Sequence, residues 1–121
     1  MRHLASSARA GDFGPLIERY ETLAVVWDAE TNFPKANKIF DQLHAIALLL
    51  RPQAEGRHGL EKLLAHPNRG VRLKAAGECL AWDSNEAVAA LENLVVPRGR
   101  HSLSAETTLI EFRAGRMRFD W

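Results

Sequence analysis

The feature that most constrains the fold is a proline-containing turn in the middle of the chain, at residues 66–76, which reads His-Pro-Asn-Arg-Gly-Val-Arg-Leu-Lys-Ala-Ala. The residue before a proline is disfavoured in the helical region, so Pro67 predicts that one helix ends at His66. Asn68 is a favoured N-cap residue, and the small residues Ala75 and Ala76 allow close packing of the helix that follows. The segment therefore predicts two consecutive helices joined by a tight turn.

The rest of the chain repeats this alternation of apolar helical segments and breaks. Apolar residues recur at spacings of three and four, the period of one helix face, and no segment alternates with period two. The sixth segment bears Leu103, Thr107 and Ile110 as its stripe, with Phe112 as a further candidate. Six helices are predicted: near Asp12 to Thr31, Pro34 to Leu50, Glu55 to His66, Arg69 to about Trp82, a fifth between the caps at 83–86 and Pro97, and a sixth from Ser102 or Ser104 to Gly115.

Two short stretches repeat at a shift close to one helical pair. Residues 60–64 (Leu-Glu-Lys-Leu-Leu) match residues 91–95 (Leu-Glu-Asn-Leu-Val) at a shift of 31, and Val71 and Leu80 match Leu103 and Phe112 at a shift of 32. A period in this range is typical of stacked helical repeats.

The block at residues 66–76 resembles the turn of a HEAT-like repeat, in Pro67, Asn68, Val71, Arg72 and the alanine pair. The chain from about residue 12 also resembles a group of short bacterial HEAT-like proteins of uncharacterised function, which share this block and a first helix like residues 16–20. The resemblance implies an all-α fold: a HEAT-like α-solenoid of about three antiparallel helical hairpins, forming a single domain over residues 12–121. Residues 1–11 are expected to be a disordered extension, because they offer little to bury.

Composition narrows the class of protein. The chain has 121 residues, 46% of them hydrophobic and 26% charged, which is typical of a folded globular domain. A net charge of +1 gives no general attraction to nucleic acid or to an anionic membrane. The longest apolar run, residues 45–50, is far shorter than the roughly 20 residues that span a bilayer, and the first residues lack the apolar core of a signal peptide. We therefore expect a cytoplasmic protein.

The sequence carries no catalytic signature. The five histidines sit in separate segments without metal-ligand spacing, and the glycines form no phosphate-binding loop. Cys79, the one cysteine, lies on an alanine-rich apolar face, so we expect a buried structural thiol. These observations predict no enzymatic activity, no metal site and no cofactor.

Protein binding is the function that this pattern favours. In a solenoid the second helix of each hairpin lines a concave face, which is the usual binding surface, and here these would be the second, fourth and sixth predicted helices. Mixed charge on such a face suits a polar protein partner, although the same residues could form a solvated face without a partner. The candidate partner-binding residues are Lys38, Asp41, His44, Arg72, Lys74, Glu78 and Glu106.

The resemblance to short bacterial HEAT-like proteins suggests an immunity, or antitoxin-like, protein that binds a cognate toxin domain and occludes its active site. Acidic residues such as Asp41 and Glu78 would then meet a basic substrate cleft. This step argues from fold to function.

The alternative is nucleic-acid binding. Arg69, Arg72 and Lys74 lie at the start of the fourth predicted helix, where the helix dipole is positive. The C-terminal region is rich in arginine, and Phe119 and Trp121 could stack on bases or instead dock on the last hairpin. Glutamates at positions 78, 106 and 111 interrupt this basic surface and weaken the alternative.

Overall fold

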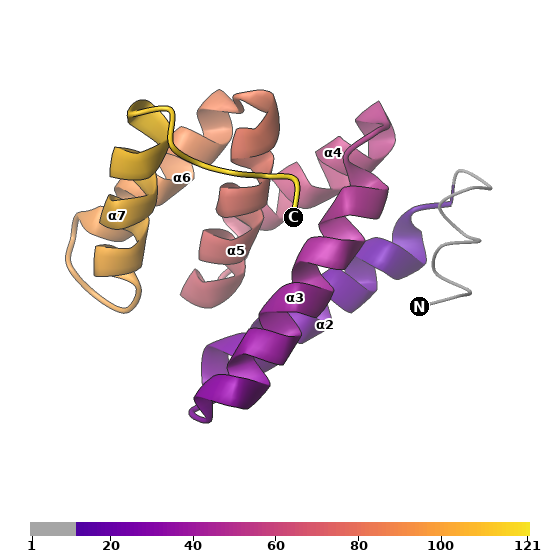
Figure 1. Ribbon diagram of the computed structural model, residues 1–121, viewed down its shortest axis with the longest axis horizontal. Helices are drawn as coiled ribbons and strands as arrows, with labels where there is room; N and C mark the ends of the chain where they lie inside the picture. The colour runs from indigo at the N-terminus through magenta and orange to yellow at the C-terminus, as the bar shows by residue number, and fades with distance from the viewer. Residues whose placement is uncertain (1–11) are drawn as a thin grey trace. The chain divides into compact units, whose positions relative to one another are not determined.

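The computed structural model describes residues 12–121, and the regular structure of these residues is entirely helical (Figure 1). Two short 3₁₀ turns, η1 and η2, extend the ends of α4 and α5. The predicted N-terminal extension, residues 1–11, lies outside the described residues. The helices are α2 (Gly14–Ala29), α3 (Phe33–Leu50), α4 (Ala54–Lys62), η1 (Leu63–Ala65), α5 (Arg69–Cys79), η2 (Leu80–Trp82), α6 (Asn85–Val95) and α7 (Ser102–Arg113).

Three of the described helices begin at a side-chain cap, whereas α2 begins after Phe13 without one. The side chains of Asn32, Asn68 and Ser84 accept hydrogen bonds from the third residue beyond each of them, and so begin α3, α5 and α6. The start of α7 differs, because His101, in the left-handed region with φ 69°, precedes it without a side-chain cap. Ser102 is the first residue of α7, and its hydroxyl donates instead to the carbonyl of Leu94 at 2.6 Å. The predicted serine cap of the sixth helix was therefore wrong.

The chain divides into two compact units, the first ending at Lys62 and the second running from Leu63 to Trp121. In the first unit, α3 contacts both α2 and α4, and α2 also contacts α4. Figure 1 shows α2 and α3 side by side. The largest fully buried side chains of this unit are Leu16, Tyr20, Leu43, Ile46, Leu50 and Leu60.

Two glycines of α4 allow the helices of the first unit to approach closely. A Cβ at Gly56 would overlap the backbone of Leu50 at the end of α3, and a Cβ at Gly59 would overlap the side chain of Ile17 on α2. Because glycine has no Cβ, α4 can lie against its neighbours at these two points. The turn between α3 and α4 is also stabilised by Arg57, whose guanidinium donates a hydrogen bond to the carbonyl of Arg51 at 2.7 Å.

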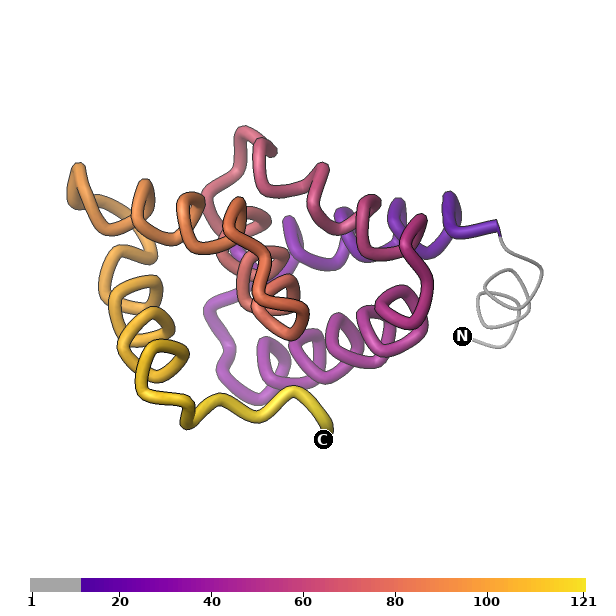
Figure 2. The backbone as a smooth tube through the Cα atoms, turned by 90° about the horizontal axis from the view of Figure 1, so that it is seen from above, coloured from indigo at the N-terminus to yellow at the C-terminus, as the bar shows by residue number. Residues whose placement is uncertain are grey.

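In the second unit, α5 contacts η1, α6 and α7, as predicted for a helix with a face of small residues. Ala75, Ala76 and Cys79 on that face are fully buried. Figure 2 shows α7 beside α6, followed by a tail over residues 116–121 that has no regular structure. The burial of residues 60–64 matches that of residues 91–95 at the first and fourth positions, where all four leucines are buried.

The predicted buried stripe of the sixth helix was wrong. In α7 the buried residues are Ser102, Ala105 and Leu109, whereas Leu103 and Ile110 are 69% and 54% exposed. The face formed by Ser102, Ala105 and Leu109 packs on the preceding helices. No further helix follows α7 among the described residues to cover the larger apolar side chains.

Candidate functional site

The turn at residues 66–76 is a structural joint. The Asn68 side chain accepts from the Val71 amide at 3.0 Å, and the Nδ1 atom of His66 accepts from the Asn68 amide at 3.0 Å. Arg72 folds back over the turn and donates to the carbonyls of His66 at 2.7 Å and Pro67 at 3.2 Å. Every polar group named here is used to hold the entry of α5, including that of the candidate binding residue Arg72.

Arg69 ties the start of α5 to the connection between α6 and α7. Its guanidinium donates to the carbonyls of Arg100 at 2.8 Å and Leu94 at 2.9 Å, and to the Ser102 hydroxyl at 3.5 Å. The Ser102 hydroxyl in turn accepts from the Gly99 amide at 2.8 Å. A basic residue that sequence patterning assigned to a possible nucleic-acid surface is thus part of the internal hydrogen bonding of the second unit.

The three candidate residues on α3 have different environments. Lys38 and Asp41 are exposed, as expected of a binding face. His44 is only 4% exposed, so the prediction that it lies on the outer face was wrong. It lies beside the buried residues Leu43 and Ile46, because α3 packs on both α2 and α4 and its buried arc is wider than the polar pattern indicated.

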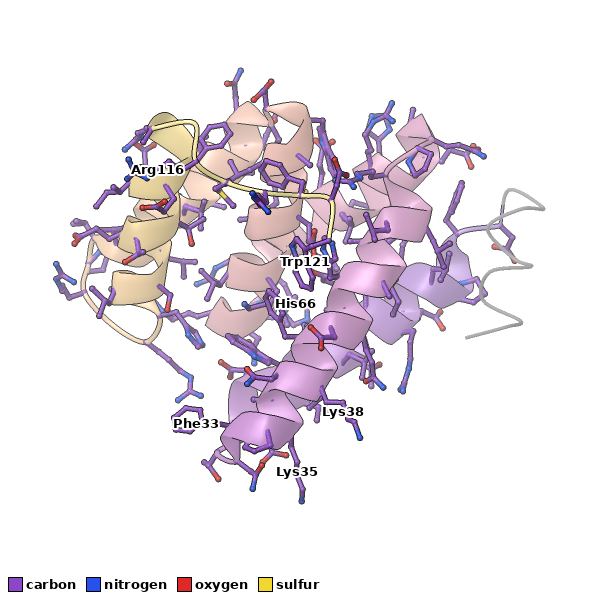
Figure 3. All side chains as sticks on the ribbon, in the orientation of Figure 1. Phe33, Lys35, Lys38, His66, Arg116 and Trp121 are labelled. Atoms are coloured by element: carbon purple, nitrogen blue, oxygen red, sulfur yellow. The ribbon has the colours of Figure 1, made fainter. Side chains whose placement is uncertain are left out.

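An exposed stripe on α3 surrounds the two exposed candidates. Phe33, Asn37 and Asp41 follow one another at spacings of four and are all exposed, with Lys38 beside them; we call these four residues the α3 surface. Phe33 is 82% exposed, which is unusual for an aromatic side chain of this size. Figure 3 shows Phe33 extending from the start of α3, with Lys38 further along the same helix.

Lys74 and Glu78 lie one turn apart on α5 and are both only partly exposed. Burial lowers the pKa of Lys74 from its ordinary value of 10.5 to about 8, and the nearby Glu78 carboxylate partly offsets this shift. Lys74 is therefore not the fully solvated cation that the prediction placed on an outer face.

Glu106, the last candidate, lies at a groove between α6 and α7 with a volume of about 490 Å³. The apolar lining of this groove comes from Val95, Val96, Leu109 and Ile110. Charged residues form its rim, and two ion pairs connect them. Glu106 pairs with Arg98 at 3.3 Å, and Glu92 of α6 pairs with Arg113 of α7 at 3.1 Å.

Four of the seven candidate residues thus lie in three separate places, and the other three, His44, Lys74 and Glu78, are buried or only partly exposed. Lys38 and Asp41 belong to the α3 surface and Glu106 belongs to the groove. Arg72 donates hydrogen bonds to the carbonyls of the turn before α5. The prediction that the second, fourth and sixth predicted helices share one binding face stays a prediction. Among the residues described, no group of three or more His, Cys, Asp or Glu side chains could hold a metal ion. No described helix is both long and apolar enough to cross a membrane.

Comparison with known proteins adds a family to this geometry. Residues 21–110, from the middle of α2 almost to the end of α7, match the model of a domain of unknown function, DUF2019. The chain belongs to the DUF2019 family. Neither the curated proteins nor the solved structures include a match to it. The DUF2019 match covers both the α3 surface and most of the groove, so both are features of the matched segment.

Sequence patterning missed the two most exposed apolar features of this DUF2019 chain. Phe33 stands next to Pro34 in what was taken as a break, although a large aromatic outside the buried stripe of its helix is itself a signal of a binding surface. The exposed apolar side of α7, part of which lines the groove, was missed because Leu103 and Ile110 have the helical spacing of a core stripe. The same spacing is equally compatible with a face that another chain covers.

Proposed function

We propose that this protein is a non-enzymatic protein-binding module and that the α3 surface is its main contact site. The observation that carries the proposal is Phe33, an aromatic side chain 82% exposed at the start of a helix. Aromatic residues dominate the binding energy of protein interfaces, because they bury a large area with little loss of conformational entropy. Further along α3, Asp41 continues the stripe of Phe33 and Lys38 lies one turn before Asp41, and these two residues supply charges of both signs that would set orientation and specificity.

We further propose that the helices form a HEAT-like solenoid of about three antiparallel hairpins, and that the protein acts in the cytoplasm as a bacterial immunity protein. In this role it would bind a toxin domain and occlude its active site. The support for this partner class is the resemblance of residues 66–76 to a HEAT-like turn, together with a single-domain size. Of the acidic residues proposed to meet a basic cleft, Asp41 is exposed and available on the α3 surface.

Nucleic-acid binding is the less well supported alternative. Arg69 and Arg72, the basic start of α5, donate hydrogen bonds to main-chain carbonyls of the chain itself. In the arginine-rich C-terminal region, Arg116 binds both carboxylate oxygens of Glu111 at 2.9 Å, which lowers the pKa of Glu111 below its usual value. These groups would have to exchange their partners before they could contact phosphates.

The proposal is tested by co-expressing the chain with toxin domains encoded beside it in its genome, and measuring growth rescue and complex formation. We expect rescue by the unchanged chain and loss of rescue by Phe33→Ala, with affinity reduced by about tenfold to a hundredfold for loss of an aromatic hot spot. Val26→Ala is the matched control, because Val26 is an exposed apolar residue of α2 outside the α3 surface.

The proposed contact site would be rejected if Phe33→Ala and Asp41→Lys bound the partner as tightly as the unchanged chain. The immunity role would be rejected if no neighbouring toxin were neutralised or bound. Salt-sensitive binding of the purified chain to DNA or RNA in a gel-shift experiment would favour the alternative.

A further inference from the structure

Lys74 differs from the other lysines of the chain in its surroundings. It lies on α5, directly before the fully buried Ala75 and Ala76, and its side chain is only partly exposed. The other lysines are all exposed, namely Lys35, Lys38 and Lys62. Lys74 is therefore the lysine that is most shielded from water, although solvent still reaches part of it.

Gly77 and Glu78 are neighbours of Lys74 on the surface of α5. They follow it by three and four residues, spacings that bring residues to the same side of a helix. A Cβ at Gly77 would meet nothing within 4 Å, so the space beside this glycine is open. Helical side chains lean toward the N-terminus, and a larger residue at position 77 would therefore cover the surface next to Lys74. The glycine leaves one side of the lysine open to small molecules.

Burial and the Glu78 carboxylate act on the amine of Lys74 in opposite directions. Burial disfavours the ammonium form and is the larger effect, so the pKa of Lys74 is lowered to about 8 even though Glu78 raises it. At pH 7 about one tenth of the Lys74 amines are then neutral, against roughly one in three thousand for a lysine of ordinary pKa. The neutral amine carries the lone pair that makes a desolvated lysine a nucleophile.

We propose that Lys74 is a site of acylation by small activated acyl donors, which approach over the open surface beside Gly77. The lone pair of the Lys74 Nζ atom attacks the carbonyl carbon of the donor and forms an N–C bond. The bond from that carbon to the leaving oxygen or sulfur breaks, and the leaving group takes the bonding electrons. The nitrogen then loses its extra proton to water, and a neutral amide remains.

The surroundings of Lys74 favour a short acyl group. The side chain is only partly exposed and adjoins core residues, so an acetyl group can reach the amine more easily than a long acyl chain. Acylation would replace a largely buried cation by a neutral amide and so remove the cost of burying the charge. This site goes beyond the proposed function and does not depend on it, because Lys74 is not part of the α3 surface.

Brief treatment of the purified full chain with acetyl phosphate, followed by mass spectrometry of each lysine, tests the proposal. Lys62, which is exposed, is the internal reference. At pH 7 we expect acetylation of Lys74 to be about tenfold faster than that of Lys62, because the larger neutral fraction outweighs the lower basicity of the amine. As the pH rises past about 8, the rate at Lys74 should level off while the rate at Lys62 continues to rise. A parallel reaction with acetyl coenzyme A shows whether thioesters donate as well as acyl phosphates.

Two variants separate the open approach from the electrostatics of the amine. Gly77→Leu covers the surface beside Lys74 and should slow acetylation of Lys74 several-fold without changing the rate at Lys62. Glu78→Gln removes the carboxylate that favours the ammonium form, so the midpoint of the Lys74 pH profile should move to lower pH. Glu55→Gln, at an exposed glutamate of α4, is the matched control and should leave the midpoint unchanged. Circular dichroism shows whether each variant remains folded, and Gly77→Ala replaces Gly77→Leu if the larger side chain disturbs the helix.

Acetylation of Lys74 no faster than that of Lys62 at pH 7 would overturn the proposal. It would also be overturned if the rates at the two lysines rose in parallel up to pH 10.5, because Lys74 would then be an ordinary solvated amine. An unchanged rate at Lys74 in a folded Gly77→Leu variant would reject the approach beside Gly77. None of these results bears on toxin binding, which is measured with Phe33→Ala.

Discussion

The two units of the molecule keep their helices together by different means. In the first unit, the contact between α4 and its neighbours depends on glycines, which remove the Cβ atoms that would collide with the Leu50 backbone and the Ile17 side chain. In the second unit, the connections are tied by side chains that hydrogen-bond to the main chain, above all Arg69 and Arg72. The first unit also has one bond of this kind, from Arg57 to the carbonyl of Arg51, but its close helix contacts depend on the absence of Cβ atoms. The second unit depends on the hydrogen-bond donors that its side chains supply.

The largest effect is expected at Gly56. Gly56→Ala should lower the free energy of unfolding by about 3 kcal/mol, because the added methyl group collides with backbone, which cannot move aside as a flexible side chain can. Urea unfolding measures the loss. Gly77→Ala on α5 is the matched control: a Cβ there would meet nothing within 4 Å, and alanine should stabilise the helix by about 0.5–1 kcal/mol. Equal changes in the free energy of unfolding for Gly56→Ala and Gly77→Ala would show that the first unit does not depend on the missing Cβ atom at Gly56.

The next effect is expected at Arg69, in the second unit. Arg69→Met keeps an apolar stem but removes the donors to Leu94, Arg100 and Ser102, and should cost about 2 kcal/mol. Arg98→Met is the control, because within residues 12–121 Arg98 is held by an exposed ion pair with Glu106, and its loss should change stability by less than about 0.5 kcal/mol. Thermal unfolding of the two variants in parallel decides the point. If Arg69→Met were as stable as Arg98→Met, the hydrogen bonds from Arg69 to the α6–α7 connection would not contribute to the stability of the second unit.

A matched pair of helix caps sharpens the comparison further. Asn32 begins α3 in the first unit and its cap bond is exposed, whereas Asn68 begins α5 in the second unit and its cap bond is partly buried. Both substitutions to alanine remove one cap, but Asn68→Ala should cost about 1–2 kcal/mol and Asn32→Ala about 0.5–1 kcal/mol. Hydrogen exchange of the Val71 and Lys35 amides reports each cap separately. A larger loss at Asn32 would contradict the greater role of polar contacts in the second unit.

These residues also show how far the sequence could predict the structure. Prolines and caps are local signals, so the limits of α3, α5 and α6 were predicted to within a few residues from Pro34, Asn68 and Pro97. The all-helical class follows from the same periodicity. Apolar spacing then located the buried leucines of residues 60–64 and 91–95, because those positions face a neighbour in each case.

The failures have one physical cause, which is that periodicity identifies a face but not what covers it. Leu103 and Ile110 have the spacing of a core stripe, but α7 packs through Ser102 and Ala105 instead. His44 looks polar in the sequence and is buried because α3 has neighbours on two sides. The roles of Arg69 and Arg72 could not be predicted either, since their acceptors are main-chain carbonyls, which have no sequence signature.

The smallest effect is expected at Lys74. Unlike Arg69 and Arg72, whose hydrogen bonds stabilise the second unit, Lys74 is a largely buried cation whose burial costs free energy. Its pKa is lowered to about 8, so between pH 8 and 10.5 the unfolded chain holds more protons at this position than the folded chain does. Stability therefore rises with pH through this window, and below it the penalty for burying the charge is fully present. Lys74→Met removes this penalty and should stabilise the protein at pH 7 by about 1 kcal/mol, after the lost attraction to Glu78 is taken into account.

Urea unfolding at pH 7 and at pH 10 measures this difference, which should shrink at the higher pH as the unchanged chain loses its proton. Lys62→Met, at an exposed lysine, is the control and should show no such dependence. A stabilisation that stayed constant between the two pH values would mean that methionine improves packing and that the charge of Lys74 is irrelevant. A destabilisation at pH 7 would instead mean that the attraction between Lys74 and Glu78 outweighs the cost of burying the lysine. Lys74 would then stabilise the second unit through its polar contacts, as Arg69 does.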